Sequence, residues 1–150
     1  MKEDELQVFL EGVQNYFAQM AGEEIFVGTP YLIENDVPEA QQYSGVIAIT
    51  GRHKGVVYFT APADMVRRLL GLMGEPDVSE SNIMDLVGEV ANTIAGNARK
   101  KFGDRFEISV PFVVHGAPDE SILPRQDRSF VIPLEWKMHK AAIVVSLHKE

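Results

Sequence analysis

The sequence predicts an α+β fold in which a mainly antiparallel sheet packs against helices, in the order αβββααβββ. Three segments carry apolar residues at the helical period, whereas shorter runs rich in β-branched and aromatic residues are separated by turn residues. Runs of strands joined by hairpins, with the helices grouped together, are typical of such a fold. Since no linker or low-complexity tract interrupts the 150 residues, we expect a single domain over residues 1–150.

The first helix is expected over residues 4–21, ending near Gly22. Its apolar positions recur at helical spacing, which indicates an amphipathic helix. These positions are Leu6, Phe9, Leu10, Val13, Phe17 and Met20.

Three strands should follow this helix. Residues 25–33 are strand-like, and Pro30 favours a sheet edge or a bulge there, because proline cannot donate to a strand ladder. Residues 43–50 and 55–60 flank a turn at 51–54 and indicate an antiparallel hairpin.

Two helices are expected next. The second helix opens around Pro62 and closes at Gly74, and a polar loop over residues 75–80 leads to the third. Ser79 or Ser81 can cap the start of the third helix, and Gly103 is its expected stop.

The remaining chain predicts three more strands. One strand covers residues 106–115, and a hairpin follows over 128–138 and 141–148. Residues 143–147 are a candidate for an open sheet edge, where a second copy could pair. The polar loop at 116–125 is either a recognition loop or a mobile one, and the sequence favours neither.

The third helix, Ser81–Phe102, is the most informative segment because four special residues share its solvent face. Asp85, Glu89, Asn92 and Gly96 fall within about 60° of one another on the helix cylinder. A carboxylate and a carboxamide at i and i+3 can act on one small target, and Gly96 leaves room for another molecule. The opposite side is apolar and should dock on the core: Ile83, Met84, Val87, Val90, Ala91, Ile94, Ala98 and Phe102.

The run Asp85-Leu-Val-Gly-Glu89-Val-Ala-Asn92 resembles the signature helix of the CheC/CheX family of chemotaxis phosphatases, with the CheX branch as the nearest pattern. That pattern is an acidic residue or serine, three residues, Glu, two residues and Asn. It continues to a proline in the next strand, for which Pro111 is the candidate. The preceding segment from Gly55 to Pro62, followed by a helix rich in Val and Leu, is also similar to the family.

The resemblance implies a phosphatase that removes the aspartyl phosphate of a CheY-like response regulator. Such a partner brings its own Mg²⁺ and lysine, so this chain would need no cofactor and supplies an oriented in-line water. Asn92 is the expected water-orienting residue, since a neutral amide can both accept and donate hydrogen bonds. Glu89 would pair with the regulator's lysine. Asp85, Gly96 and Asn97 are expected to contact the partner, and the resemblance also implies a homodimer.

Composition excludes several other classes of function. A net charge of −8 argues against nucleic-acid binding, which needs clusters of Lys and Arg. Without cysteine, the chain has no thiolate nucleophile, disulfide framework or cysteinyl metal site. It shows no signal peptide and no apolar run of membrane-spanning length, so we expect a cytoplasmic protein that does not bind membranes.

The four histidines carry no expected chemistry. His53, His115, His139 and His148 fall in turns or at strand ends and should be solvated or capping side chains. No two of them have metal-ligand spacing, and no metal site is predicted.

Two other functions remain open at the level of sequence. The same fold could be a module that binds a response regulator or a flagellar switch component without hydrolysis. It could also be a dimerisation domain whose exposed Glu and Asn are merely solvated. The presence of both Glu89 and Asn92 favours the enzyme, because an adaptor has no need for that pair.

Overall fold

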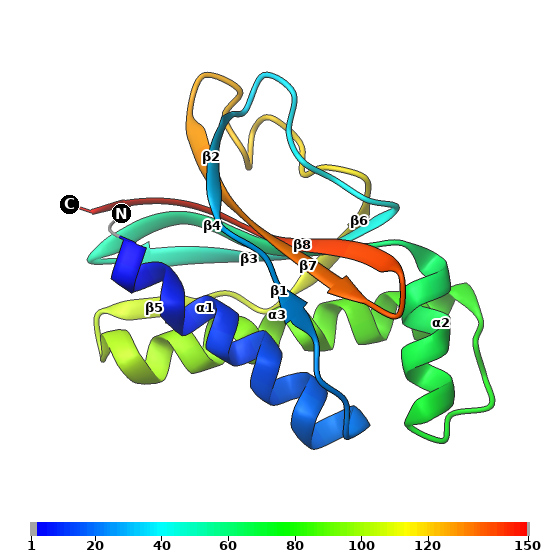
Figure 1. Cartoon of the computed structure of the whole chain (residues 1–150). Helices are drawn as coiled ribbons and strands as arrows, with labels where there is room; N and C mark the ends of the chain where they lie inside the picture. Colours follow the sequence, from blue (N-terminus) through cyan, green and yellow to red (C-terminus); the bar gives the residue numbers. More distant parts are fainter. Residues whose placement is uncertain (1–2, 150) are drawn as a thin grey trace.

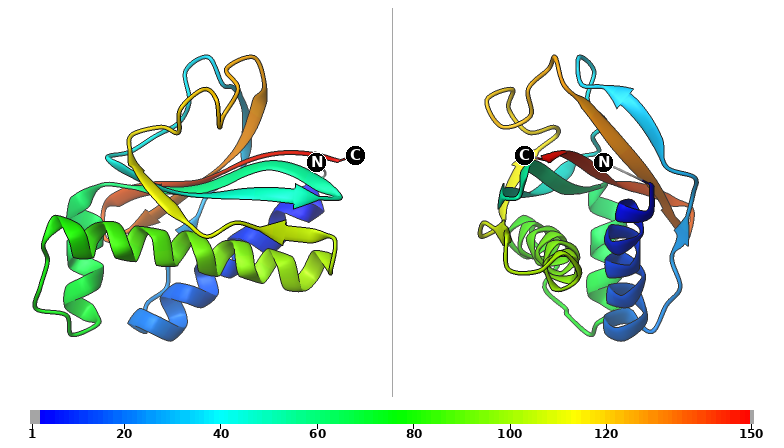
Figure 2. Two further views of the ribbon diagram at one scale, coloured as in Figure 1. Left: turned by 180° about the vertical axis from the view of Figure 1, so that it is seen from behind. Right: turned by 90° about the vertical axis from the view of Figure 1, so that its left-hand side faces the viewer.

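One antiparallel sheet organises the chain, with the α-helices gathered on one of its faces (Figures 1 and 2). The structure is a computed structural model that describes residues 3–149. Within this range the helical segments are α1 (Glu3–Tyr16), η1 (Phe17–Ala21), α2 (Ala63–Leu72) and α3 (Glu80–Phe102). The strands are β1 (Phe26–Val27), β2 (Tyr31–Glu34), β3 (Tyr43–Gly51), β4 (His53–Ala61), β5 (Phe106–Ile108), β6 (Phe112–His115), β7 (Arg128–Trp136) and β8 (His139–Lys149).

The predicted fold class is confirmed. The sheet has the order β1-β7-β8-β4-β3-β5, with β2 also paired to β7 and β6 also paired to β3, and every pairing is antiparallel. Both predicted hairpins form. The turn between β7 and β8 holds Lys137 and Met138 at positive φ, the geometry that matches the twist of two adjoining strands.

Two of the predicted strands are each divided in two. The first divides at Gly28–Pro30, where Gly28 N–H donates to the Pro133 carbonyl (2.8 Å) and both halves pair with β7 at the sheet edge. The second divides at Ser109–Pro111. There β5 pairs Ile108 with Ile49 and β6 pairs Phe112 with Val46, so residues 109–111 lie opposite residues 47–48. This one-residue excess is a β-bulge, and it bends the strand away from its original line.

The first helix ends differently from a regular α-helix. Its last turn, η1, is π-helical, and Gly22 follows in the left-handed conformation (φ 64°). A π turn holds one more residue than an α turn, which rotates the following positions about the axis. Met20 therefore leaves the buried stripe to which its spacing assigned it and is 45% exposed.

The main core lies between the helices and one face of the sheet. Its largest fully buried members include Phe9, Phe17, Ile47, Ile94 and Ile143. The other face of the sheet is covered in part by residues 116–125. Leu123 is fully buried there against Tyr58 and Val144.

The loop at 116–125 therefore packs on the sheet through Leu123, which neither of the two expectations for it, a recognition loop or a mobile loop, had included. Arg125 holds it together by donating from its two terminal nitrogens to the carbonyl oxygens of Leu123 (2.9 Å) and Pro118 (3.0 Å).

Two sequence-based expectations are wrong. His53 is 7% exposed, because its ring packs against Phe102 and Phe106 and its Nε2 lies 3.4 Å from Glu5 Oε2. Residues 143–147 lie in β8, which pairs with β4 on one side and β7 on the other, so they form a central strand. In the described chain, the open edges belong to β1 with β2 and to β5 with β6. Between residues 3 and 149, we find no helix with the length and apolar character that crossing a membrane requires.

Candidate active site on helix α3

Helix α3 runs beneath the sheet (Figure 2). Asp85, Glu89 and Asn92 are all exposed. The predicted apolar side is buried or half-buried, and Leu86 and Ala95 are buried as well. The helical spacing of the apolar residues therefore predicted correctly which side of this helix is buried.

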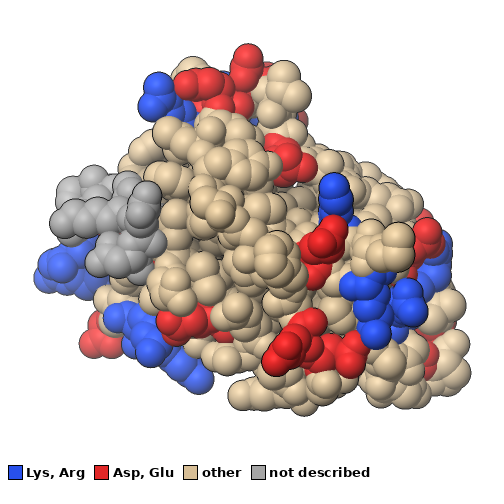
Figure 3. Space-filling model, in the orientation of Figure 1, with Lys and Arg blue, Asp and Glu red and all other residues tan. Residues whose placement is uncertain are grey.

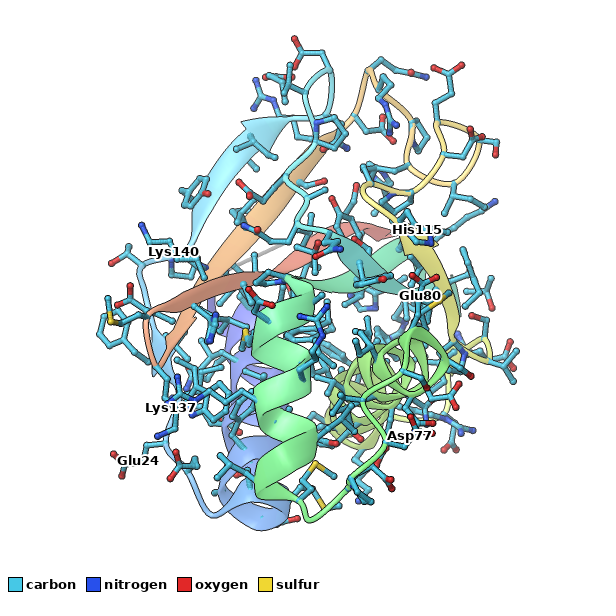
Figure 4. The ribbon with its side chains drawn as sticks, turned by 90° about the vertical axis from the view of Figure 1, so that its right-hand side faces the viewer. Glu24, Asp77, Glu80, His115, Lys137 and Lys140 are labelled. Atoms are coloured by element: carbon cyan, nitrogen blue, oxygen red, sulfur yellow. The ribbon has the colours of Figure 1, made fainter. Side chains whose placement is uncertain are left out.

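The start of α3 is fixed by side chains from three other segments. Ser79 Oγ caps the helix by accepting from Asn82 N–H, and Asn82 Nδ2 donates to the Asp77 carbonyl (2.9 Å). Tyr43 of β3 donates to Glu80 Oε2 (3.0 Å). His115 of β6 lies on the same side, its Nε2 3.9 Å from Glu80 Oε1, as Figure 4 shows.

The Asp77 carboxylate contributes to this cap. It accepts hydrogen bonds from Ser79, and these hold the pKa of Asp77 below its usual value.

The middle of α3 lies directly on strand β3. A Cβ atom added at Gly45 would sit 2.6 Å from the Val87 carbonyl oxygen and 3.1 Å from the Ala91 Cβ. Only a residue without a side chain permits this approach of helix to strand. This contact prevents α3 from rotating about its own axis. The backbone positions of Glu89 and Asn92 are therefore fixed.

The bulge in the β5–β6 segment packs against the flank of α3. A Cβ at Gly88 would lie 3.3 Å from Val113 Cγ2 and 3.7 Å from Pro111 Cβ. Pro111 thus lies beside the residue that precedes Glu89, one helical turn from Asn92. The candidate for the proline of the family pattern therefore lies beside the helical turn that leads to the candidate pair.

The second half of α3 is joined to α1. A Cβ at Gly12 would lie 3.1 Å from Ile94 Cα and 3.3 Å from Asn97 Cβ, so the two helices cross closely at this point. Asn97 Nδ2 donates to the Val8 carbonyl (2.8 Å). Asn97 was predicted to contact a partner, and that prediction stays untested; in the structure the side chain links two helices.

A hollow opens beside Asn92 where α1 and η1 diverge from α3. We call it the α1–α3 hollow, and its lining includes Asn15, Tyr16, Gln19, Asn92, Gly96 and Lys100. A Cβ added at Gly96 would meet no neighbouring atom within 4 Å, so this position borders open space.

Tyr16 was not singled out by the sequence. The side chain is 3% exposed, and its hydroxyl has no hydrogen-bond partner among the described residues. Burial, together with the negative charge of Glu89, raises the pKa of Tyr16 far above its ordinary value. The hydroxyl is therefore a neutral donor within electrostatic reach of the candidate pair. Its position on the apolar stripe of α1, three residues after Val13, could have signalled its burial.

Chemically, the exposed pair supplies a carboxylate and a carboxamide one turn apart, at a Cβ separation of roughly 5–6 Å. Among residues 3–149, no group of three His, Asp or Glu side chains is placed to hold a metal ion. On the face drawn in Figure 3, the described acidic and basic side chains lie around a broad uncharged centre and do not merge into one basic patch. The pair can orient a water and bind a cation, but it offers no nucleophile of its own.

The segment that carries this site matches a known protein family. The family model described as chemotaxis phosphatase CheX matches residues 43–135, which include β3, the whole of α3 and Pro111. A search of curated proteins finds no significant match.

Several solved structures share the fold over almost the whole chain. A CheC-like superfamily protein from Shewanella sp. PV-4 is 24% identical, with 99% of each chain covered and a TM-score of 0.81. The chemotaxis protein CheX from Vibrio vulnificus is 22% identical, with 97% and 99% covered and a TM-score of 0.79. The CheX–CheY–BeF₃–Mg²⁺ complex from Borrelia burgdorferi is 16% identical to the chain, with 99% and 100% covered and a TM-score of 0.77.

Proposed function

Because the chain belongs to the CheX family of chemotaxis phosphatases, we propose that Glu89 and Asn92 act on the aspartyl phosphate of a CheY-like response regulator. The observation that carries this proposal is the exposure of both side chains on a helix held at its start, middle and end by β3, β6 and α1. Because the helix backbone is already fixed, only the two side chains need to be ordered when another protein binds.

In the proposed reaction, Asn92 orients a water in line with the bond that breaks. Its Oδ1 accepts a hydrogen bond from the water, and its Nδ2 donates to a phosphoryl oxygen. The water oxygen bonds to phosphorus while the bond from phosphorus to the aspartyl oxygen breaks. The products are the free aspartate and inorganic phosphate, which retains the oxygen of the water. An amide suits this task because a carboxylate would repel the phosphoryl group.

Glu89 has a different role in this proposal. Its carboxylate pairs with the lysine that a response regulator carries beside its phosphorylated aspartate, which fixes the approach of Asn92 one turn away. Asp85 makes a peripheral contact, and Gly96 provides clearance for the regulator. The Mg²⁺ ion is held by the regulator, in agreement with the Mg²⁺ named in the Borrelia burgdorferi complex.

We extend the proposal to the setting of the protein. The chain acts in the cytoplasm, where response regulators receive their phosphoryl groups, and it works as a homodimer. The exposed apolar side chains along the β1–β2 edge, Phe26, Tyr31 and Leu32, support pairing of two copies at this edge.

The test of the function is turnover. A CheY-like regulator from the same cell is phosphorylated in the presence of Mg²⁺, and a small molar fraction of this protein is added. We expect each molecule to clear many phosphorylated regulators, so that the signal decays much faster than the spontaneous rate. A protein that binds the regulator without accelerating the decay would instead be a binding module of the same fold.

A further inference from the structure

We propose that the α1–α3 hollow is a docking subsite for a hydrogen-bond acceptor of the regulator, a carbonyl or carboxylate group, which accepts a hydrogen bond from the Tyr16 hydroxyl. This inference rests on the proposed function, since it takes the regulator as the partner. It adds Tyr16, Lys100 and the π-helical turn η1 to the regulator-binding surface of the chain.

The first argument is position. Asn92 lies both in the candidate pair and in the lining of the hollow. A partner that brings a phosphoryl group within reach of Asn92 must therefore cover the mouth of the hollow as well. Gly96 keeps that mouth open, because its position borders space with no atom within 4 Å.

The second argument is the unsatisfied hydroxyl of Tyr16. Buried polar groups are almost always hydrogen-bonded, and leaving one without a partner destabilises the protein. Tyr16 is 3% exposed and its hydroxyl has no partner in the described chain. A buried hydroxyl without a partner calls for an explanation, and an acceptor supplied by a bound protein is one such explanation. Tyr16 lines the hollow together with the exposed residues Asn15, Gln19 and Asn92.

The third argument is the chemistry of the remaining lining. Asn15 and Gln19 carry amide donors, and Lys100 brings a positive charge. This set favours an acceptor with partial or full negative charge over a cation. The wall that carries Gln19 is the π-helical segment Phe17–Ala21, a kind of turn that is frequent at functional sites.

The experiment measures the affinity of the regulator, loaded with beryllofluoride and Mg²⁺ as a stable mimic of its phosphorylated form, for the full chain and its variants. Tyr16→Phe removes the hydroxyl and keeps the ring. We expect the Kd to rise roughly tenfold, as the loss of one hydrogen bond predicts. The Tm should stay the same or rise, since an unsatisfied buried group has been removed.

Tyr58→Phe is the matched control. Tyr58 is also fully buried, but it packs on the other face of the sheet and its hydroxyl donates to the Glu39 carbonyl (2.8 Å). This variant should lose a few degrees of Tm and keep the Kd of the wild type. Opposite effects on affinity and stability would separate a docking role from a structural one.

Gly96→Leu provides an independent check by filling the mouth of the hollow. No atom lies within 4 Å of the added Cβ, so the protein should fold normally and bind the regulator more weakly. Unchanged Kd values for Tyr16→Phe and Gly96→Leu, with a wild type that binds, would overturn the docking subsite and the clearance role of Gly96, and would leave the proposed roles of Glu89 and Asn92 standing. A wild type that does not bind the loaded regulator would overturn both the subsite and the proposed function.

Discussion

At the scale of single residues, the candidate site depends on two exposed side chains whose chemistry is simple. Asn92 and Glu89 supply no nucleophile and hold no metal ion by themselves. Their contribution to catalysis must therefore come from their position relative to the substrate. The exposed side of α3 carries them, while the neighbouring Gly88 is buried against Pro111 and Val113. The buried residues of this stretch therefore have a packing role, while Glu89 and Asn92 are free to meet a partner.

Glu89→Gln tests the ion pair with the regulator's lysine. We expect the Kd of the phosphorylated regulator to rise roughly tenfold, because a charge-assisted hydrogen bond is replaced by a neutral one. The Tm should not change, since the side chain is exposed. Asp85→Asn, the same chemical change one turn earlier, is the matched control and should have a smaller effect. Lost turnover with unchanged affinity would mean that the roles of Glu89 and Asn92 must be exchanged.

The sequence was sufficient to find the pair but not its surroundings. The helical period of α3 put Asp85, Glu89 and Asn92 on one face, and the spacing of their residue types matched a known family. Tyr16 lies on a different helix, 73 residues before Glu89 in the chain. Its proximity to the pair depends on the close crossing of α1 and α3 at Gly12, and no local pattern encodes that crossing.

At the scale of elements, the position of α3 depends on backbone contacts that glycine permits. Gly45 lets β3 approach the Val87 carbonyl, and Gly12 lets α1 approach Ile94. The bulge at 109–111 then turns Pro111 toward the same helix. Three separate elements therefore fix one helix, and a disturbance of any one of them should change stability as well as activity.

Gly45→Ala tests the contact between α3 and β3. The added methyl group would meet the Val87 carbonyl oxygen at 2.6 Å, so helix or strand must move. We expect the free energy of unfolding to fall by about 1–3 kcal/mol, measured by urea denaturation.

Gly71→Ala in α2 is the matched control for this substitution. An added Cβ there meets no atom within 4 Å, and the residue is exposed in a regular helix. This variant should gain about 0.4–1 kcal/mol, because alanine restricts the unfolded chain. If the two variants had equal stability, the close packing of α3 on β3 would be contradicted.

Periodicity predicted the elements well and their interruptions poorly. A bulge and a π turn each add one residue to a regular element, which leaves the composition of the segment unchanged. The sequence therefore indicated one strand at 106–115 and a regular helix to residue 21. Residues 143–147 were assigned to an open edge for a related reason: neighbouring strands are chosen by long-range pairing, which the alternation within one strand does not contain.

At the scale of the whole molecule, the candidate site and the proposed dimer edge lie on different parts of the fold. The helices carry the candidate site below the sheet, while the β1–β2 edge carries Phe26 at 66% exposure and Leu32 at 46%. An open strand edge with apolar side chains is a surface on which a second copy can pair. This separation allows a dimer to form while both candidate sites stay open to regulators.

Phe26→Glu tests the proposed dimer. A charge in the middle of an apolar edge should prevent pairing, so light scattering after gel filtration should give the mass of one chain instead of two. The turnover of phosphorylated regulator should be kept, because β1 lies outside the α1–α3 hollow and outside α3. A variant that stays dimeric would show that the copies pair elsewhere, or that the β5–β6 edge is used.

The most direct test of the account is the decay of phosphate on the regulator at saturating concentrations of the wild-type protein and of Asn92→Ala. At saturation all of the regulator is bound, so the decay rate does not depend on the Kd. The measurement then reports only the orienting role of the amide. Asn82→Ala, the same change near the start of α3, serves as the control: it loses the hydrogen bond to the Asp77 carbonyl, so its Tm should fall, but at saturation it should keep the wild-type rate. We predict rapid decay with the wild type and decay at the spontaneous rate with Asn92→Ala, whose Tm should be unchanged. Equal acceleration by the wild type and Asn92→Ala would contradict the assignment of the active site to this face of α3.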